Sequence, residues 1–185
     1  FQNAQEIFDR FPEVDFGIYE CPMPWKRLVS LDFLRKVAPE GRMVFLKDTC
    51  CDYELIRERL KAVEGTPLKI FNANAQSWYD SYCHGSAGYN GVMANFHPDL
   101  YKWAYDHKDS DPEKAQLVAH FLTTAAMIEM RAYPVSAKYH QNLVDVPMSL
   151  VTRSADAAKL DKNARGEVES LIAMENYVRK QLGIL

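Results

Sequence analysis

The chain has 185 residues, of which 48% are hydrophobic, and a formal net charge of -3. This composition is typical of a globular protein with a single core, and the dispersed basic residues exclude the charge signature of a nucleic-acid or anionic-membrane partner. No apolar run approaches the eighteen or so residues that would span a bilayer. The opening segment FQNAQEIFDRFPEVD is charged where a signal peptide would be apolar, so we expect a cytoplasmic protein.

The first half of the chain alternates short apolar strands with amphipathic helices, a pattern that favours βα units and parallel strand pairing. Strands are predicted at residues 16–19, 43–46, 68–71 and 88–93. Helices are predicted between them, and one before the first strand, at residues 4–10, 30–38, 53–63 and 76–84. Ser30 is the expected N-cap of the second of these helices.

After Pro98 the chain is predicted to be entirely helical, with Pro134 and Pro147 as helix breakers. The expected helices cover residues 99–107, 112–131, 135–143 and 155–182. Four βα units are too few to close an eight-stranded barrel, and their sheet would have open edges. The first residues already form part of a helix and no methionine stands before Phe1, so we expect these residues to be half of a larger fold.

Lys47 is the leading candidate for chemistry, because it follows the apolar strand MVFL and opens a polar turn. At the carboxyl end of a barrel strand, an apolar interior would remove the solvation that favours its charged form. A neutral amine at this place is a nucleophile toward a carbonyl. A surface lysine that only ends a strand is the structural alternative.

Tyr19 ends the preceding strand in the same way, so its phenol could point toward Lys47 and pass protons. A core aromatic with a satisfied hydroxyl is the alternative for this tyrosine. Asn72, Asn74 and Asn90 follow the third and fourth strands and could bind substrate, although asparagines in such loops also serve as simple turn residues.

Four segments together resemble the dihydrodipicolinate synthase and N-acetylneuraminate lyase family. GIYECP (residues 17–22) is similar to the family's Y-N-x-P segment, and FLKDT (45–49) to its G-x-K-[DE]-[ST] segment. GYNGVMAN (88–95) resembles the G-x-x-G-x-x-[AYT]-N turn, and YPVSAK (133–138) resembles N-P-x-x-x-K in the helical tail. The segments occur in family order and extend over nearly the whole chain.

The resemblance implies an α/β fold, a (β/α)8 TIM barrel of which this chain holds strands 5–8 in residues 1–107. Residues 108–185 would be a helical extension that packs on the barrel. It also implies a class I aldolase or lyase, in which Lys47 forms an imine with pyruvate or another 2-keto acid and Tyr19 shuttles protons. An aldehyde is the second substrate, Thr49 faces the substrate, and neither a metal nor an organic cofactor takes part.

The same resemblance implies a homotetramer or homodimer, and a requirement for the amino-terminal half of the barrel.

Several positions depart from the family. Pro24 stands where dihydrodipicolinate synthases carry a carboxylate-binding arginine, and Lys26 or Arg27 could replace it only if the loop is rearranged. Val92 stands where sialic acid lyases use a serine. The aldehyde therefore stays unassigned, with Thr49 favouring the sugar-acid lyases slightly.

The alternative to an enzyme is a family member that has lost catalytic activity and binds or senses a 2-keto acid. The presence of both Tyr19 and Lys47 favours the enzyme, and the substituted arginine position favours the binding protein.

Overall fold

The computed structural model describes residues 1–184 and divides the chain into two compact units. Unit 1 is Phe1–Gly91 and unit 2 begins at Val92. The sequence predicts a boundary between barrel and helical extension at residue 107, and this boundary stays a prediction. The two compact units instead meet between Gly91 and Val92, before the fifth helix. Each unit is described below by itself. No helix among the described residues is long and apolar enough to cross a membrane.

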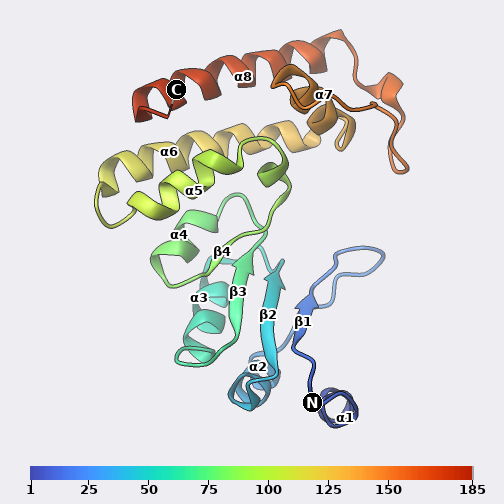
Figure 1. Ribbon diagram of the computed structural model, residues 1–185, viewed down its shortest axis with the longest axis vertical. Coiled ribbons are helices and arrows are strands. Elements are labelled where there is room, and N and C mark those ends of the chain that lie inside the picture. Colours follow the sequence, from blue (N-terminus) through green and yellow to red (C-terminus); the bar gives the residue numbers. More distant parts are fainter. Residues whose placement is uncertain (185) are drawn as a thin grey trace. The chain divides into compact units, whose positions relative to one another are not determined.

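Unit 1 is built on a parallel four-stranded sheet whose strands lie in sequence order, β1-β2-β3-β4 (Figure 1). The strands are β1 (Phe16–Tyr19), β2 (Met43–Asp48), β3 (Lys69–Asn72) and β4 (Gly88–Tyr89). The α-helices are α1 (Gln2–Arg10), α2 (Leu31–Val37), α3 (Tyr53–Ala62) and α4 (Trp78–Cys83), and a 3-10 turn, η1 (Ala38–Glu40), follows α2. The predicted alternation and parallel pairing are confirmed.

One face of this sheet forms the core of unit 1. Leu46 and Ile70 project from β2 and β3 and are each only 1% exposed, and they belong to one cluster with the buried faces of α2 and α3. Side chains on a strand alternate between the two faces of the sheet, so the residues next to Leu46 and Ile70 point to the opposite face. The helix side chains in this cluster are Leu34, Val37, Ile56 and Leu60.

The opposite face carries Tyr19, Phe45, Lys47 and Phe71, and it stays exposed or half-buried within unit 1. The rings of Phe45 and Phe71 lie 5.0 Å apart across the strands. Gly88 is required beside them, because a Cβ atom there would stand 2.7 Å from the Phe71 ring. An aromatic row with one lysine therefore lines the uncovered side of the sheet.

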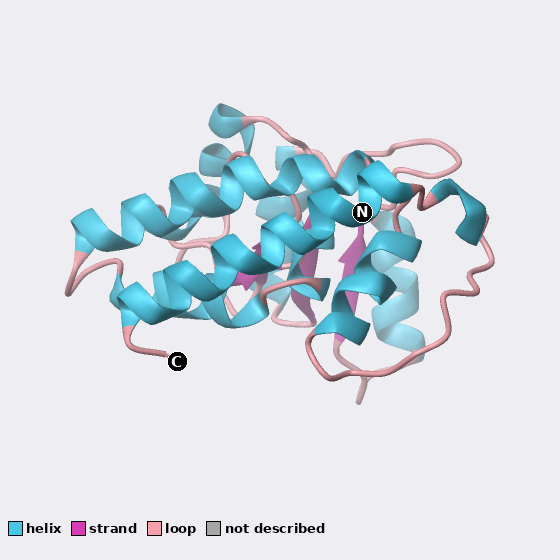
Figure 2. Cartoon of the chain, turned by 90° about the horizontal axis from the view of Figure 1, so that it is seen from above, coloured by secondary structure: helices cyan, strands magenta, loops and turns pink. Residues whose placement is uncertain are grey.

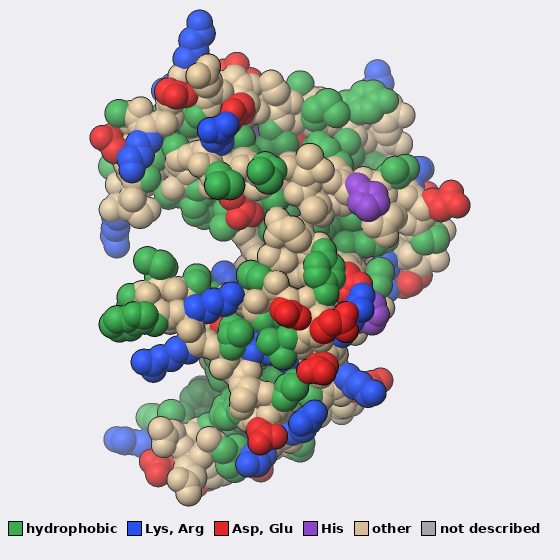
Figure 3. Space-filling model, turned by 180° about the vertical axis from the view of Figure 1, so that it is seen from behind, with side chains coloured by type: hydrophobic (Ala, Val, Ile, Leu, Met, Phe, Trp, Pro, Cys, Tyr) green, Lys and Arg blue, Asp and Glu red, His purple; other side chains and the backbone are tan. Residues whose placement is uncertain are grey.

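The outer surface of unit 1 mixes charges of both signs. Figure 3 shows acidic and basic side chains interspersed on the face opposite to that of Figure 1. Arg57 on α3 illustrates the mixing, because it pairs with Glu54 and Asp80. Interspersed charge of this kind agrees with the dispersed basic residues noted in the sequence.

Unit 2 is helical, and its long helices α6 and α8 run alongside one another in both views (Figures 1 and 2). Its α-helices are α5 (Pro98–His107), α6 (Pro112–Ala125), α7 (Val135–Leu143) and α8 (Lys162–Leu182), with 3-10 turns η2 (Val92–Asn95), η3 (Ala126–Met130) and η4 (Ala157–Lys159). Side chains of Asp111 and Asp161 cap α6 and α8 by accepting bonds from Lys114 N and Ala164 N.

Three predicted elements differ most from the structure in their extent. The fourth strand ends at Tyr89 rather than Met93, because β3 ends at Asn72 and offers no further pairing edge. The helix expected over 112–131 turns into the 3-10 segment η3 after Ala125. The helix expected from Ala155 begins only at Lys162, where Asp161 supplies the N-cap.

A buried ionic cluster joins the helices of unit 2. Glu175 on α8 is fully buried and contacts His97 Nδ1 at 2.7 Å and His140 Nε2 at 3.0 Å. Arg179, one turn later, lies 3.2 Å from the same carboxylate and also pairs with Asp99 on α5. Burial alone would raise the pKa of Glu175, but hydrogen bonds and charge from His140 and His97 lower it to about 2.

The pH dependence of stability should reveal this cluster. A carboxyl whose folded pKa is about 2, against an ordinary 4.5, stabilises the fold above pH 4.5 and loses that contribution as the pH falls toward 2. We expect about 3 kcal/mol to disappear over this interval, measured by urea unfolding. Glu175→Gln should flatten the profile there. Glu167→Gln on the exposed side of α8 is the control and should keep the wild-type slope; equal slopes in all three proteins would contradict the assignment.

Candidate active site

Lys47 and Tyr19 lie together at the carboxyl ends of two adjacent parallel strands. Tyr19 on β1 is the register partner of Lys47 on β2, and both side chains point to the uncovered face of the sheet. Lys47 Nζ stands 4.3 Å from the centre of the Tyr19 ring. Tyr19 is 50% exposed, so the core-aromatic alternative does not describe its surroundings in unit 1. The structure thus brings together the two residues predicted from the sequence.

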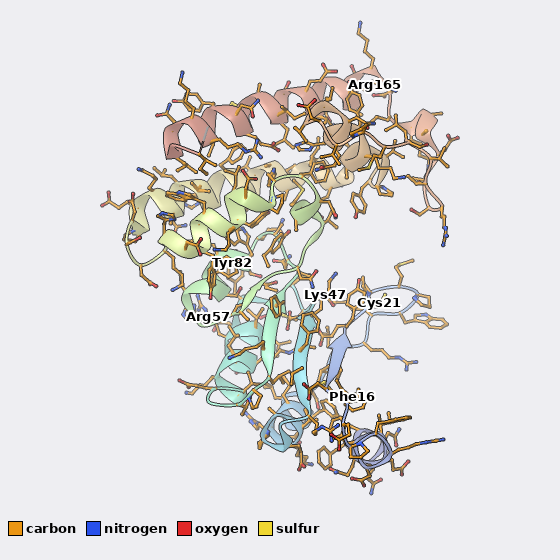
Figure 4. The ribbon with its side chains drawn as sticks, in the orientation of Figure 1. Phe16, Cys21, Lys47, Arg57, Tyr82 and Arg165 are labelled. Carbon is orange, nitrogen blue, oxygen red and sulfur yellow. The ribbon has the colours of Figure 1, made fainter. Side chains whose placement is uncertain are left out.

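Lys47 lies within β2, which extends two residues beyond the predicted strand to Asp48. The longer strand fixes the backbone of the lysine in the sheet rather than in a turn. Figure 4 shows Lys47 near the end of β2 and Cys21 at the start of the loop that follows β1. A cation over an aromatic ring is attracted by the negative ring face, which orients the amine toward Tyr19.

The residues that follow Tyr19 and Lys47 turn to the opposite face and enter a buried ionic cluster. Glu20 follows Tyr19 and is 2% exposed, and Asp48 follows Lys47 and is 0% exposed. Both carboxylates pair with Arg59 of α3, which is also completely buried. Arg59 Nη2 lies 2.9 Å from Glu20 Oε1, and Arg59 Nη1 contacts both Glu20 Oε2 and Asp48 Oδ2. We call these three residues the Arg59 cluster.

Backbone groups complete the Arg59 cluster. Glu20 accepts bonds from Val29 N at 2.7 Å and Thr49 N at 2.9 Å, and Asp48 accepts one from Cys50 N at 2.9 Å. Arg59 Nη2 donates a further bond to Val29 O at 2.6 Å. Burial alone would lower the pKa of Arg59, but its bonds with Glu20 and the charge of Asp48 raise it, so the guanidinium stays charged. Every carboxylate oxygen of the cluster therefore has a donor.

The loops after β1 and β2 are connected by further contacts. Lys26 reaches from the first loop to Cys50 O at 3.5 Å and to Cys51 Sγ at 3.8 Å, so this loop folds back over the second. Burial, followed by the hydrogen bond and charge of Asp48, raises the pKa of Cys50 to about 12, which keeps its thiol neutral. Whether Lys26 or Arg27 replaces the carboxylate-binding arginine stays a prediction, since the contacts of Lys26 are with the second loop.

The predicted substrate-binding residues differ in burial and in their hydrogen-bond partners. Thr49 is buried and its hydroxyl donates to Glu20 O at 2.7 Å. Asn72 is fully buried: its amide donates to Ser77 and Ser81, and its oxygen accepts from Asn74 N. Asn74 accepts bonds from the backbone and hydroxyl of Ser77.

These bonds favour the turn interpretation for Asn72 and Asn74. Asn90 is half-buried just after β4, and its backbone N–H donates to Asn72 O at 2.8 Å. The substrate-binding role of the four residues stays a prediction. Among residues 1–184, no three His, Cys, Asp or Glu side chains are arranged so that they could hold a metal ion.

The comparison with solved structures identifies the fold. A prophage protein of E. coli K12 from the dihydrodipicolinic acid synthase family, solved in complex with pyruvate, matches 94% of this chain with a TM-score of 0.79 and 17% identity. Dihydrodipicolinate synthase of Thermotoga maritima matches 100% of it, with a TM-score of 0.74 and 18% identity. A monomeric dihydrodipicolinate synthase variant also matches 100%, with a TM-score of 0.76 and 17% identity. The chain has the dihydrodipicolinate synthase fold.

The chain covers only part of those proteins, namely 59%, 61% and 60% of their respective lengths. No model of a protein family matches the sequence, and no curated protein matches it significantly. A parallel four-stranded sheet followed by helices is consistent with half of a dihydrodipicolinate synthase barrel and its helical tail.

The Arg59 cluster was not predicted from the sequence, although Arg59 itself carried a signal. Arg59 falls between Ile56 and Leu60 on the apolar stripe of the predicted helix, where a charged side chain has to be paired. Glu20 and Asp48 gave no such signal, because each comes just beyond a predicted apolar strand, where polar turn residues are expected.

Proposed function

We propose that this protein is a class I aldolase or lyase that forms an imine between Lys47 and pyruvate or another 2-keto acid. It would make or break a carbon–carbon bond to an aldehyde, without a metal or organic cofactor. The observation that carries the proposal is the Lys47 Nζ atom 4.3 Å from the Tyr19 ring, on the uncovered face of the sheet. An amine supplies the nucleophile for imine formation, and a phenol on a neighbouring residue can carry the protons.

The reaction follows from these two groups. The Lys47 amine attacks the ketone carbon, and the carbinolamine loses water to give a protonated imine. Loss of a proton from the neighbouring carbon gives an enamine, whose carbon attacks the aldehyde carbon while the aldehyde oxygen gains a proton. Water then hydrolyses the imine and restores Lys47. Tyr19 is the proposed carrier of these protons.

The proposal includes the surroundings of the site. The four strands would be strands 5–8 of an eight-stranded barrel, with the Lys47 face turned to the barrel interior. The pyruvate bound in the E. coli neighbour supports a 2-keto acid as substrate. Thr49 and Asn90 stay candidate substrate contacts. Assembly as a homodimer or homotetramer stays a prediction that size-exclusion chromatography with light scattering tests.

Reductive trapping tests the imine directly. The full-length protein is incubated with pyruvate and borohydride, and its intact mass and peptide map are recorded. We expect one reduced pyruvate adduct per chain, on the peptide that contains Lys47, and none on the peptide that contains Lys69 at the start of β3. Omitting pyruvate should abolish the label.

The two possible failures differ. A fully folded protein that takes no label on Lys47 but binds pyruvate in calorimetry would favour the binding or sensing protein over the enzyme. A label spread over exposed lysines at similar yields would show that Lys47 has no special reactivity and would contradict the proposed site.

A further inference from the structure

We propose that Arg59 is a positioning residue for this site and acts through Glu20 and Asp48 to hold Tyr19 and Lys47 in their relative places. This inference rests on the proposed function for the catalytic role of Tyr19 and Lys47, and it adds how these two residues are held in place. Its first support is adjacency in the strands. Glu20 and Asp48 are each covalently next to one member of the pair, and side chains alternate along a strand.

The second support is that the Arg59 cluster is shut off from substrate, because Arg59 Nε, its side-chain donor without a partner among residues 1–184, is itself buried. The two Nη atoms of Arg59 contact three side-chain oxygens and Val29 O, which uses the hydrogens of both amino groups. All three side chains are at most 2% exposed and lie on the helix side of the sheet, away from the Lys47 face. The cluster therefore makes no contact with substrate and is connected to the Tyr19–Lys47 pair through the backbone of β1 and β2.

The third support is the weakness of the other bonds between these strands. β1 has four residues, and within unit 1 it pairs with β2 alone. The register of the pair shifts between Phe16 and Gly17, so the ladder is irregular at its start. At the functional end, the last backbone bond runs from Glu20 N to Lys47 O at 3.3 Å. The Thr49 hydroxyl bonds to Glu20 O at 2.7 Å there, and the ionic cluster adds a charged cross-strand constraint that a short, irregular ladder lacks.

Arg59→Lys and Arg57→Lys provide a matched test in the full-length protein. Both positions lie on α3, and both arginines make paired bonds to carboxylates. Arg57 bonds to Asp80 at 2.9 and 2.5 Å and to Glu54 at 3.1 Å, and Figure 4 shows it apart from Lys47. Lysine retains the charge in each case but cannot reproduce the planar fork of arginine. Only the change at 59 should disturb the two strands.

Two readouts separate positioning from a general loss of stability. The first is the rate of deuterium exchange into the methyl group of pyruvate, expressed per Lys47 site that borohydride can trap. We expect Arg59→Lys to lower this rate about 10- to 100-fold, the loss expected when catalytic groups are misplaced by about 1 Å. The KM for pyruvate should change less than about threefold. Arg57→Lys should keep the wild-type rate per site.

The second readout does not need activity. With [ε-13C]lysine, the Lys47 signal should be displaced by the Tyr19 ring current, and Arg59→Lys should abolish the displacement whereas Arg57→Lys should retain it. A wild-type rate per site and an unchanged Lys47 signal in Arg59→Lys would reduce Arg59 to a structural residue. Equal effects of both variants would also overturn the inference. A wild-type protein that forms no imine would refute the proposed function, while the NMR comparison would still decide the role of Arg59.

Glu20→Gln covers the case in which Arg59→Lys does not fold. It keeps the shape of the Glu20 side chain and removes its charge and one accepting oxygen. The same fall in rate per site and the same change of the Lys47 signal are expected from it, and their absence in a folded Glu20→Gln protein would contradict the positioning role.

Discussion

Lys47→Arg is expected to abolish turnover, with pyruvate exchange reduced by about four orders of magnitude or more, a loss typical of removing a covalent nucleophile. Arginine is positively charged and can remain over the Tyr19 ring. It cannot form the imine, because the guanidinium does not lose its proton under these conditions. The variant should therefore fold, bind the keto acid and fail in chemistry alone.

Methyl-proton exchange of pyruvate in deuterium oxide measures this effect without knowledge of the aldehyde, since it reports enamine formation. Lys69→Arg, at the start of the neighbouring strand β3, is the matched control and should exchange at the wild-type rate. Exchange by Lys47→Arg within tenfold of wild type would show that another group forms the imine.

Tyr19→Phe is expected to lower the exchange rate by about two to four orders of magnitude, the range attributed to a positioned general acid or base. The aromatic ring remains, so Lys47 keeps its cation–ring contact, and only the hydroxyl is lost. The adduct should still form when borohydride is added after long incubation, because slow proton transfer through water can replace the phenol.

Tyr53→Phe, which removes a hydroxyl outside the site, is the control for this measurement. Tyr53→Phe removes a hydroxyl that donates to Gln76 O at 2.7 Å in a loop of unit 1, and it should leave exchange unchanged. A Tyr19→Phe protein with the wild-type rate would remove Tyr19 from the proton pathway and leave its ring as a support for Lys47.

The sequence was sufficient for the elements that depend on local pattern. The apolar runs beginning at Phe16 and Met43 became the first two strands, and Ser30 caps α2 by accepting a bond from Phe33 N. The register of Tyr19 with Lys47 could also be anticipated, because residues at the carboxyl ends of adjacent parallel strands meet at one edge of the sheet.

Features that depend on distant partners could not be read in the same way. The length of β4 is set by where β3 ends, which no property of residues 88–93 reveals. The delayed start of α8 depends on the choice of Asp161 as N-cap among several polar residues. Glu20, Asp48 and Arg59 are up to 39 positions apart, and nothing local shows that they share one buried site.

The ion pairing within the Arg59 cluster also constrains how the sequence can diverge. Loss of Arg59 alone leaves two buried carboxylates without their cation, and loss of either acid leaves a buried guanidinium with unused donors. Replacement of all three by apolar side chains avoids both costs. Among homologues that keep Tyr19 and Lys47, positions 20, 48 and 59 should therefore covary as a set, with the charged triad retained whole or exchanged whole.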